Sequence, residues 1–150
     1  MDKKNVQRTT DTQQVISLLR RTPIFAAVSE ETLEAMLKST IQKTVEAGAK
    51  IVEQGKEGIG FYLILEGKAE VVKETVKLGE LGVGDFFGEL ACIDGEPRTA
   101  DVVAVAGTTC LVITQWGMNS IIESCPGVAL GMLKELVGRL RTSNAALHTS

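Results

Sequence analysis

The sequence predicts a mainly β domain: an eight-stranded antiparallel β-roll (jelly roll) with helices before and after it. Short runs of β-type composition alternate with glycine-containing turns from residue 41 to residue 114, and the spacing of apolar residues is helical on both sides of that region. The chain has 150 residues, of which 44% are hydrophobic, so it can bury one core. We expect a flexible leader at residues 1–14, one folded domain at 15–144 and a frayed tail at 145–150.

Two short N-terminal helices are expected before the roll. The first has apolar residues at helical spacing: Val15, Ile16, Leu18 and Leu19. It should end before Pro23, because proline cannot continue a helix. Ser29 is a suitable N-cap for the second helix, since its hydroxyl can accept a hydrogen bond from an unpaired backbone N–H. Glu30 and Glu31 then lie in the first turn, where negative charges stabilise the positive end of the helix dipole.

The roll itself is expected to consist of short strands joined by tight turns. The expected strands cover residues 41–45, 50–53, 60–65, 69–73, 76–81, 86–89, 100–106 and 109–114. Glycines such as Gly48 and Gly107 lie between them, and we assign these glycines to turns rather than to a ligand site. Eight short strands at this spacing are typical of a two-sheet roll.

Helical spacing returns after Thr114, with one C-terminal helix expected over residues 116–123 and a longer one beginning near Pro126. The longer helix carries an apolar stripe: Ala129, Met132, Leu133, Leu136, Val137 and Leu140. A stripe of this kind usually covers a core, but it can also pair with the same stripe of a second copy. Core packing and a homodimer through the C-terminal helix therefore both remain open.

Composition argues against several classes of function. The net charge of −3 gives no reason to expect direct nucleic-acid binding, and the N-terminus lacks the apolar segment of a signal peptide. The apolar runs are too short to span a membrane, so a cytoplasmic location is expected. Cys92, Cys110 and Cys125 fit reduced core thiols better than a disulfide framework. With His148 as the sole histidine and no hydrolase or P-loop motif, we expect no metal site, no cofactor, no catalytic residue and no enzymatic activity.

The segment from Gly84 to Ala100 follows neither a strand nor a helix pattern along its whole length. It reads GDFFGELACIDGEPRTA and lies between two β-type runs. Arg98 can donate to an anion in fork geometry while staying charged. If residues 90–93 form one helical turn, the N–H groups near Glu89 point at the same anion, and Gly88 lets the backbone approach closely. The segment therefore predicts a phosphate-binding cassette.

This cassette resembles that of the cyclic nucleotide-binding domain family, which reads roughly F-G-E-L/I-A-x-x-x-G-x-P-R-S/T/A-A. The matching residues are Phe87, Gly88, Glu89, Leu90, Ala91, Gly95, Pro97, Arg98, Thr99 and Ala100. The resemblance extends to residues 55–62 and 65–67 and covers about 15–144. Glu89 and Arg98 stand nine residues apart, as in protein kinase A regulatory subunits and several bacterial domains.

The resemblance implies a role for several side chains. Arg98 would bind the cyclic phosphate and Glu89 the ribose 2′-hydroxyl. Thr99 would reach either the phosphate or the amino group of a guanine. Apolar surface for the sugar and base would come from three residues of the roll: Val71, Leu78 and Leu81. Two residues of the C-terminal helix would cap the purine, although a fraying helix end is an equal alternative for them: Ser143 and Asn144.

The function that follows is binding of a cyclic nucleotide, with cAMP favoured over cGMP, by a regulatory module without catalysis. The alternative is a module of the same fold that has no ligand and serves interaction or dimerisation. Ten residues follow Leu140, too few for the DNA-reading helices that many bacterial relatives append. We therefore expect the output to lie in an effector protein of unknown identity, in an oligomer or in further sequence.

Overall fold

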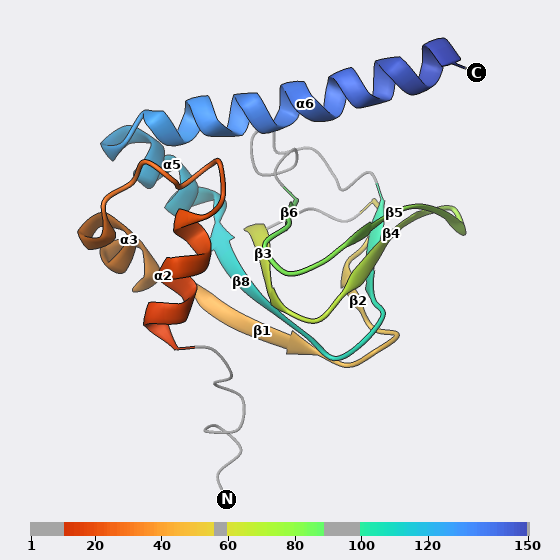
Figure 1. The fold of residues 1–150 in the computed structure, drawn as a ribbon. Helices are drawn as coiled ribbons and strands as arrows, with labels where there is room; N and C mark the ends of the chain where they lie inside the picture. Colours follow the sequence, from red (N-terminus) through yellow and green to blue (C-terminus); the bar gives the residue numbers. More distant parts are fainter. Residues whose placement is uncertain (1–10, 56–59, 89–99, 150) are drawn as a thin grey trace, which may run out of the picture.

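The computed structural model describes residues 11–55, 60–88 and 100–149, the last seven by their backbone alone. Within these residues, eight strands form two four-stranded sheets with the orders β1-β8-β3-β6 and β2-β7-β4-β5. The paired strands are antiparallel. Figure 1 shows the two sheets wrapped into a roll, with helices gathered at one end and one long helix lying across it. The predicted β-roll with flanking helices is confirmed.

The strands lie close to their expected positions. They are β1 (Ile41–Val45), β2 (Lys50–Val52), β3 (Gly60–Glu66), β4 (Ala69–Lys73), β5 (Val76–Leu81), β6 (Phe86–Phe87), β7 (Asp101–Ala104) and β8 (Thr108–Thr114). The seventh strand was expected to continue to residue 106 but ends at Ala104. The backbone turns there, because Val105 N–H donates to the Lys68 carbonyl and the Thr108 hydroxyl donates to the Ala106 carbonyl.

The described residues form four helices: α2 (Thr12–Arg20), α3 (Glu30–Leu37), α5 (Gln115–Ser124) and α6 (Gly127–Thr149). The first three of them begin at a residue whose side chain caps the helix. Asp11 and Gln14 form a capping box, so α2 begins at Thr12, inside the segment expected to be a leader. Ser29 caps α3 as predicted, accepting from the Thr32 N–H. The last helix has no proline to stop it and continues through the segment expected to be a tail, to Thr149.

Two hydrophobic cores lie on opposite faces of the β1-β8-β3-β6 sheet. The helical core packs this sheet against the helices and contains alternate residues of β3 and β8: Phe61, Leu63, Leu65, Leu111 and Ile113. The roll core lies between the two sheets and contains the intervening residues: Tyr62, Ile64, Cys110 and Val112. Side chains that alternate along a strand point to opposite faces, which is why β3 and β8 are buried at six consecutive positions.

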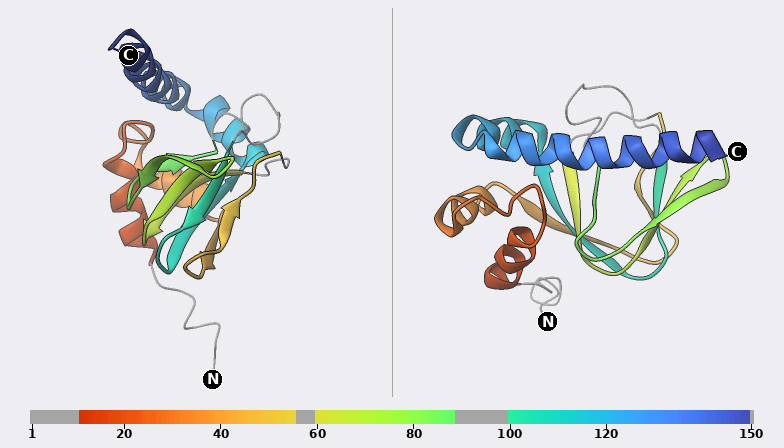
Figure 2. Two further views of the ribbon diagram at one scale, coloured as in Figure 1. Left: turned by 90° about the vertical axis from the view of Figure 1, so that its right-hand side faces the viewer. Right: turned by 45° about the horizontal axis from the view of Figure 1, so that its top comes forward.

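The first turns of α6 fix its course across the roll. Val128 and Met132 belong to the helical core. Gly131 approaches the N-terminal segment so closely that a Cβ there would lie 2.8 Å from the Ile24 Cα and the Pro23 carbonyl oxygen. Two further views show the later turns of α6 continuing beyond these contacts as one straight helix (Figure 2).

Candidate functional site

The first residues of the predicted cassette, which we call its entrance, include the two adjacent buried phenylalanines of β6, Phe86 and Phe87. Phe86 points into the helical core, where its ring stacks on Phe61 with centroids 4.7 Å apart. Phe87 points the other way into the roll core and stacks on Tyr62 with centroids 5.0 Å apart. Gly88 follows with φ of 86°, a backbone conformation that side chains with a Cβ rarely adopt. The chain therefore enters the cassette from a fixed strand through a glycine turn.

The exit from the cassette is held by Asp101. Ala100 is half-buried, and β7 begins at the next residue. The Asp101 carboxylate accepts a hydrogen bond of 2.7 Å from the Gln54 N–H and lies 3.4 Å from the Lys50 ammonium. The hydrogen bond from Gln54, and then the charge of Lys50, hold the pKa of this carboxyl below its usual value. Sequence reasoning missed Asp101, because its partners lie about fifty residues earlier and no local pattern joins them.

The β4–β5 hairpin carries the three residues predicted to contact sugar and base. Val71 and Leu81 are half-buried and pack against the roll core. The strand register pairs Val71 with Gly79 and Val72 with Lys77, so Leu78 falls at an irregularity between them. Leu78 is 60% exposed. The structure therefore brings Val71 and Leu81 to one side of the hairpin. The side on which Leu78 lies does not follow from the regular alternation of side chains along a strand.

A hollow of about 550 Å³ opens along one side of α6. It is lined by residues that recur at helical spacing: Glu135, Gly138, Arg139 and Thr142. The Arg139 guanidinium donates a hydrogen bond of 3.2 Å to the Phe86 carbonyl, so this side of the helix faces the strand that leads into the cassette. The hollow is therefore polar on its helix side and lies beside the cassette entrance.

The opposite side of α6 is apolar and exposed. Its residues are Leu130, Leu133, Val137 and Leu140, with 54%, 58%, 45% and 59% of their surface accessible. Val137 is two residues from both Glu135 and Arg139, which is about 200° of rotation around a helix. The stripe that the sequence predicted therefore divides: Met132 is buried in the helical core, whereas Leu133, Val137 and Leu140 face away from the hollow. Leu130, which the prediction did not include, is exposed on the same side.

Comparison with known proteins agrees with this architecture. The family model described as "Cyclic nucleotide-binding domain" matches residues 42–125, more than half of the chain. The chain belongs to the cyclic nucleotide-binding domain family. The predicted family resemblance is thus confirmed.

Individual relatives come from several classes of protein. A cAMP-dependent protein kinase regulatory subunit of Yarrowia lipolytica is 41% identical over 81 residues, which are 54% of this chain and 22% of the relative. A cGMP-dependent protein kinase of Plasmodium berghei is 31% identical over 134 residues, 89% of this chain and 15% of the relative. The crystal structure of the Thermus thermophilus catabolite activator protein superposes with a TM-score of 0.78 at 28% identity, covering 85% of this chain and 62% of that one. The chain thus spans less than a quarter of the two kinase relatives.

Much of the predicted ligand set of this cyclic nucleotide-binding domain lies outside the described residues. This holds for Glu89, Leu90, Ala91, Pro97, Arg98 and Thr99, and for the side chains of Ser143 and Asn144. The sequence did not single out three residues that line the α6 hollow: Glu135, Arg139 and Thr142. Their spacing of four and three residues, on the side of the helix opposite the apolar stripe, is the signal that could have found them.

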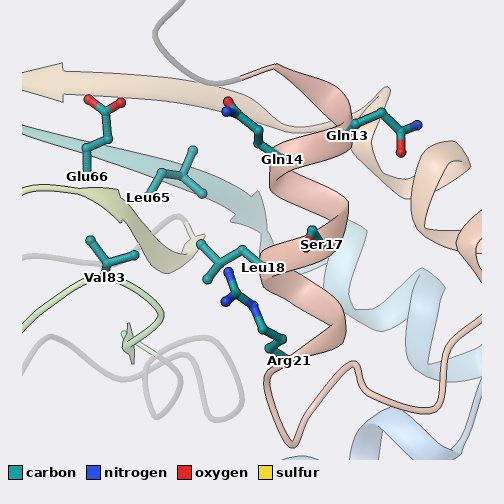
Figure 3. A pocket seen from close by; sticks show the side chains of 8 residues that line it. All are labelled: Gln13, Gln14, Ser17, Leu18, Arg21, Leu65, Glu66 and Val83. Carbon is teal, nitrogen blue, oxygen red and sulfur yellow. The ribbon is translucent and has the colours of Figure 1, made fainter.

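A second hollow of about 440 Å³ lies on another part of the domain, between α2 and the end of β3. Figure 3 shows Leu18 of α2 and Arg21, the C-cap residue that follows α2, across from Leu65, Glu66 and Val83. Among the residues that the structure describes, it shares no lining residue with the α6 hollow. Arg21 lies at the rim of this separate hollow. It is therefore a suitable control when an arginine of the cassette is substituted.

The described residues contain no cluster of three or more His, Cys, Asp or Glu side chains that could hold a metal ion. No helix in the described part of the chain combines the length and the apolar character needed to cross a membrane. Cys110 is buried in β8, and this burial raises the pKa of its thiol to about 12. Cys125 is half-buried, and Cys92 lies outside the described residues.

Proposed function

We propose that this domain binds a purine cyclic nucleotide, cAMP in preference to cGMP, and acts as a cytoplasmic sensing module without turnover. An effector protein, not identified by the sequence, would read the bound state. The observation that carries the proposal is that the family's anion-binding and ribose-binding residues, Arg98 and Glu89, are both present in a complete cassette.

Geometry on both sides of the cassette supports this proposal. The rings of Phe86 and Phe87 hold its entrance in two cores, and Asp101 holds its exit against the Gln54 backbone. The α6 hollow lies beside the entrance and adds polar groups. Anchoring both ends of the cassette favours binding of a ligand whose single negative charge contacts an arginine. A site that is already ordered loses less conformational entropy when the ligand binds. Two relatives are named for cAMP-dependent and cGMP-dependent kinases, which fits a purine cyclic nucleotide.

Calorimetric titration of one preparation with cAMP, cGMP and linear 5′-AMP tests the proposal. We expect saturable binding in the order cAMP, cGMP, 5′-AMP, because the linear nucleotide carries a second phosphate charge and lacks the ring. Heat denaturation followed by chromatography of the supernatant checks whether nucleotide was already bound. A preparation that is free of nucleotide and binds none of the three would rule the proposal out.

The exposed stripe of α6 favours a second function, association with another copy of this chain. Leu130, Leu133, Val137 and Leu140 are spaced by three, four and three residues, the a/d pattern of a two-stranded coiled coil. Four exposed large apolar residues on one helix side are an unfavourable surface in water. We propose that a second α6 covers this stripe while the polar side stays on the roll.

Sedimentation of wild type and of a Leu133→Glu, Leu140→Glu variant tests this pairing. We expect a dimer that dissociates in the variant, since a buried glutamate without a partner opposes association. Lys43→Glu introduces a similar charge at an exposed position of β1, outside α6, and should leave the dimer intact. Circular dichroism should show both variants folded, because the substituted side chains are exposed. A monomeric wild type would remove this second function.

A further inference from the structure

The hollow of about 440 Å³ beside α2 (the α2 hollow) has an apolar centre between two charged ends. Its apolar floor consists of three side chains: Leu18, Leu65 and Val83. Figure 3 shows Glu66 at the end near the beginning of α2, and Arg21 at the end where the helix stops. Polar side chains line the helix side: Gln13, Gln14 and Ser17. The order along the hollow is therefore acidic, apolar and basic.

The walls of the α2 hollow are fixed by contacts of their own. In the turn between β5 and β6, the Gly84 N–H donates to the Ile64 carbonyl at 2.9 Å. The Gly82 N–H donates to the Asp85 carboxylate at 2.8 Å. This turn holds the Val83 side chain in solvent, with 57% of its surface accessible. A segment that filled the hollow would therefore cover an apolar side chain that the rest of the fold leaves in water.

The two charged ends of the α2 hollow are unpaired. Among the residues that the structure describes, neither the Arg21 guanidinium nor the Glu66 carboxylate forms an ion pair or a hydrogen bond. The neighbouring Arg20 differs, because it lies 3.9 Å from the Glu30 carboxylate. Unpaired charges of opposite sign at the ends of one hollow favour an occupant with complementary charges at its own ends.

The N-terminal segment, residues 1–10, is joined to α2 at Asp11, beside this hollow. Ten extended residues reach roughly 33 Å, whereas the helix rises only about 15 Å from Asp11 to Arg21. Counted back from α2, the segment is basic, then apolar, then acidic: Arg8, Val6 and Asp2. Lys3 and Lys4 also lie in it, and their long side chains can keep their ammonium groups in water. The segment thus complements the hollow in reach and in the order of its charges.

We propose that the N-terminal segment folds back along α2 and docks in the α2 hollow of its own chain. Arg8 pairs with Glu66 at the near end, and Val6 packs on the apolar floor. Asp2 pairs with Arg21 at the far end. The docked segment ties α2 to the end of β3. Docking needs no nucleotide, so it is independent of the proposed function.

Trypsin cleavage after Arg8 in the full-length protein tests this docking, with mass spectrometry to follow that one bond. A docked segment is cleaved slowly, because the protease acts on the open form. We expect cleavage to be about threefold faster in Asp2→Lys and in Arg21→Glu, as for loss of one exposed ion pair. The double variant restores a pair of opposite charges, so its cleavage should return towards the wild-type rate.

Lys38→Glu is the matched control for these variants. Lys38 is the exposed C-cap of α3, as Arg21 is of α2, and it is a described residue that does not line the hollow. Its cleavage rate should equal that of wild type. Wild-type rates in both single variants overturn the proposal. Faster cleavage in the single variants without recovery in the double variant overturns it too, because Asp2 and Arg21 then do not act as a pair.

Nuclear Overhauser effects between methyl groups provide a measurement that does not depend on a protease. We expect contacts from Val6 to Leu18 and Val83 in the full-length wild type, and their loss in Arg21→Glu. Their absence from the wild type overturns the proposal. Contacts and protection that disappear on dilution would assign the hollow to the N-terminal segment of a second copy, which also overturns docking within one chain.

Discussion

The two sheets of the roll differ in how many of their faces are covered. In the β1-β8-β3-β6 sheet, the central strands β3 and β8 are buried at six consecutive positions, because helices cover one face and the second sheet covers the other. In the β2-β7-β4-β5 sheet, β5 has no buried position and β4 has one. The first sheet thus forms part of two cores and the second sheet only one.

This difference separates stability from recognition. A strand packed on both faces tolerates little change in volume, because the surrounding side chains cannot relax freely. A strand with one open face can accept substitutions there, and its apolar residues remain accessible to a ligand. The cassette joins the two sheets, since it leaves β6 of the covered sheet and enters β7 of the open one. We therefore expect substitutions in the covered sheet to affect folding and those around the open sheet to affect binding.

The largest effect on stability is expected for Phe61→Ala in β3. Phe61 is fully buried and stacks on Phe86, so its removal leaves a cavity in the helical core. We expect a loss of about 3–5 kcal/mol in the free energy of unfolding, measured by urea denaturation. Leu78→Ala in the open sheet is the matched comparison and should cost less than about 0.5 kcal/mol, because Leu78 is largely exposed. Similar losses in the two variants would contradict the distinction between the sheets.

The next effect should fall on binding alone. Arg98→Ala removes the predicted phosphate contact, which should cost roughly 2–4 kcal/mol of affinity for cAMP, about thirty-fold to nearly a thousand-fold. The thermal midpoint without ligand should barely change. Arg98→Lys should recover part of the affinity, since it keeps the charge but not the fork. Arg21→Ala, at the rim of the hollow beside α2, should bind as wild type does; unchanged affinity in Arg98→Ala would refute the assignment.

How far the sequence predicts this molecule depends on the range of the interactions involved. Caps and strands follow from neighbours a few residues apart, and so Ser29 and the order of eight strands could be inferred in advance. Asp101 and Arg139 act on partners 47 and 53 residues away, and local patterns carry no information about such pairs. The irregularity at Leu78 was not predicted for a similar reason. The expected alternation of side chains assumes that β4 and β5 pair in a regular ladder.

A smaller loss of affinity should follow when the chain ends after Leu140. This truncation removes Thr142, which lines the α6 hollow, together with the predicted purine-capping residues Ser143 and Asn144. Contacts to the base of this kind are worth roughly 1–3 kcal/mol, so affinity and discrimination between cAMP and cGMP should both fall. Trp116, 75% exposed at the start of α5, provides a fluorescence signal for the titrations. Equal affinity and equal selectivity in both proteins would show that this segment takes no part in recognition.

The smallest expected effect concerns Asp101, which holds the exit of the cassette at the open sheet. Its pKa is lowered in the folded protein by the Gln54 N–H and then by Lys50, so the ionised form stabilises the fold at pH values above the ordinary pKa of the unfolded chain, 3.8. This contribution is lost as the pH falls through the lower folded pKa.

Asp101→Asn keeps an oxygen that can accept from Gln54 but removes the charge. We therefore expect the variant to unfold at a lower temperature than wild type at pH 6, and the gap between the two to close as the pH is lowered below 3.8. Glu53→Gln removes an exposed carboxylate beside β2 and is the control for a change of one charge. A gap for Asp101→Asn that stays constant as the pH is lowered would mean that the charge of Asp101 does not hold the exit of the cassette.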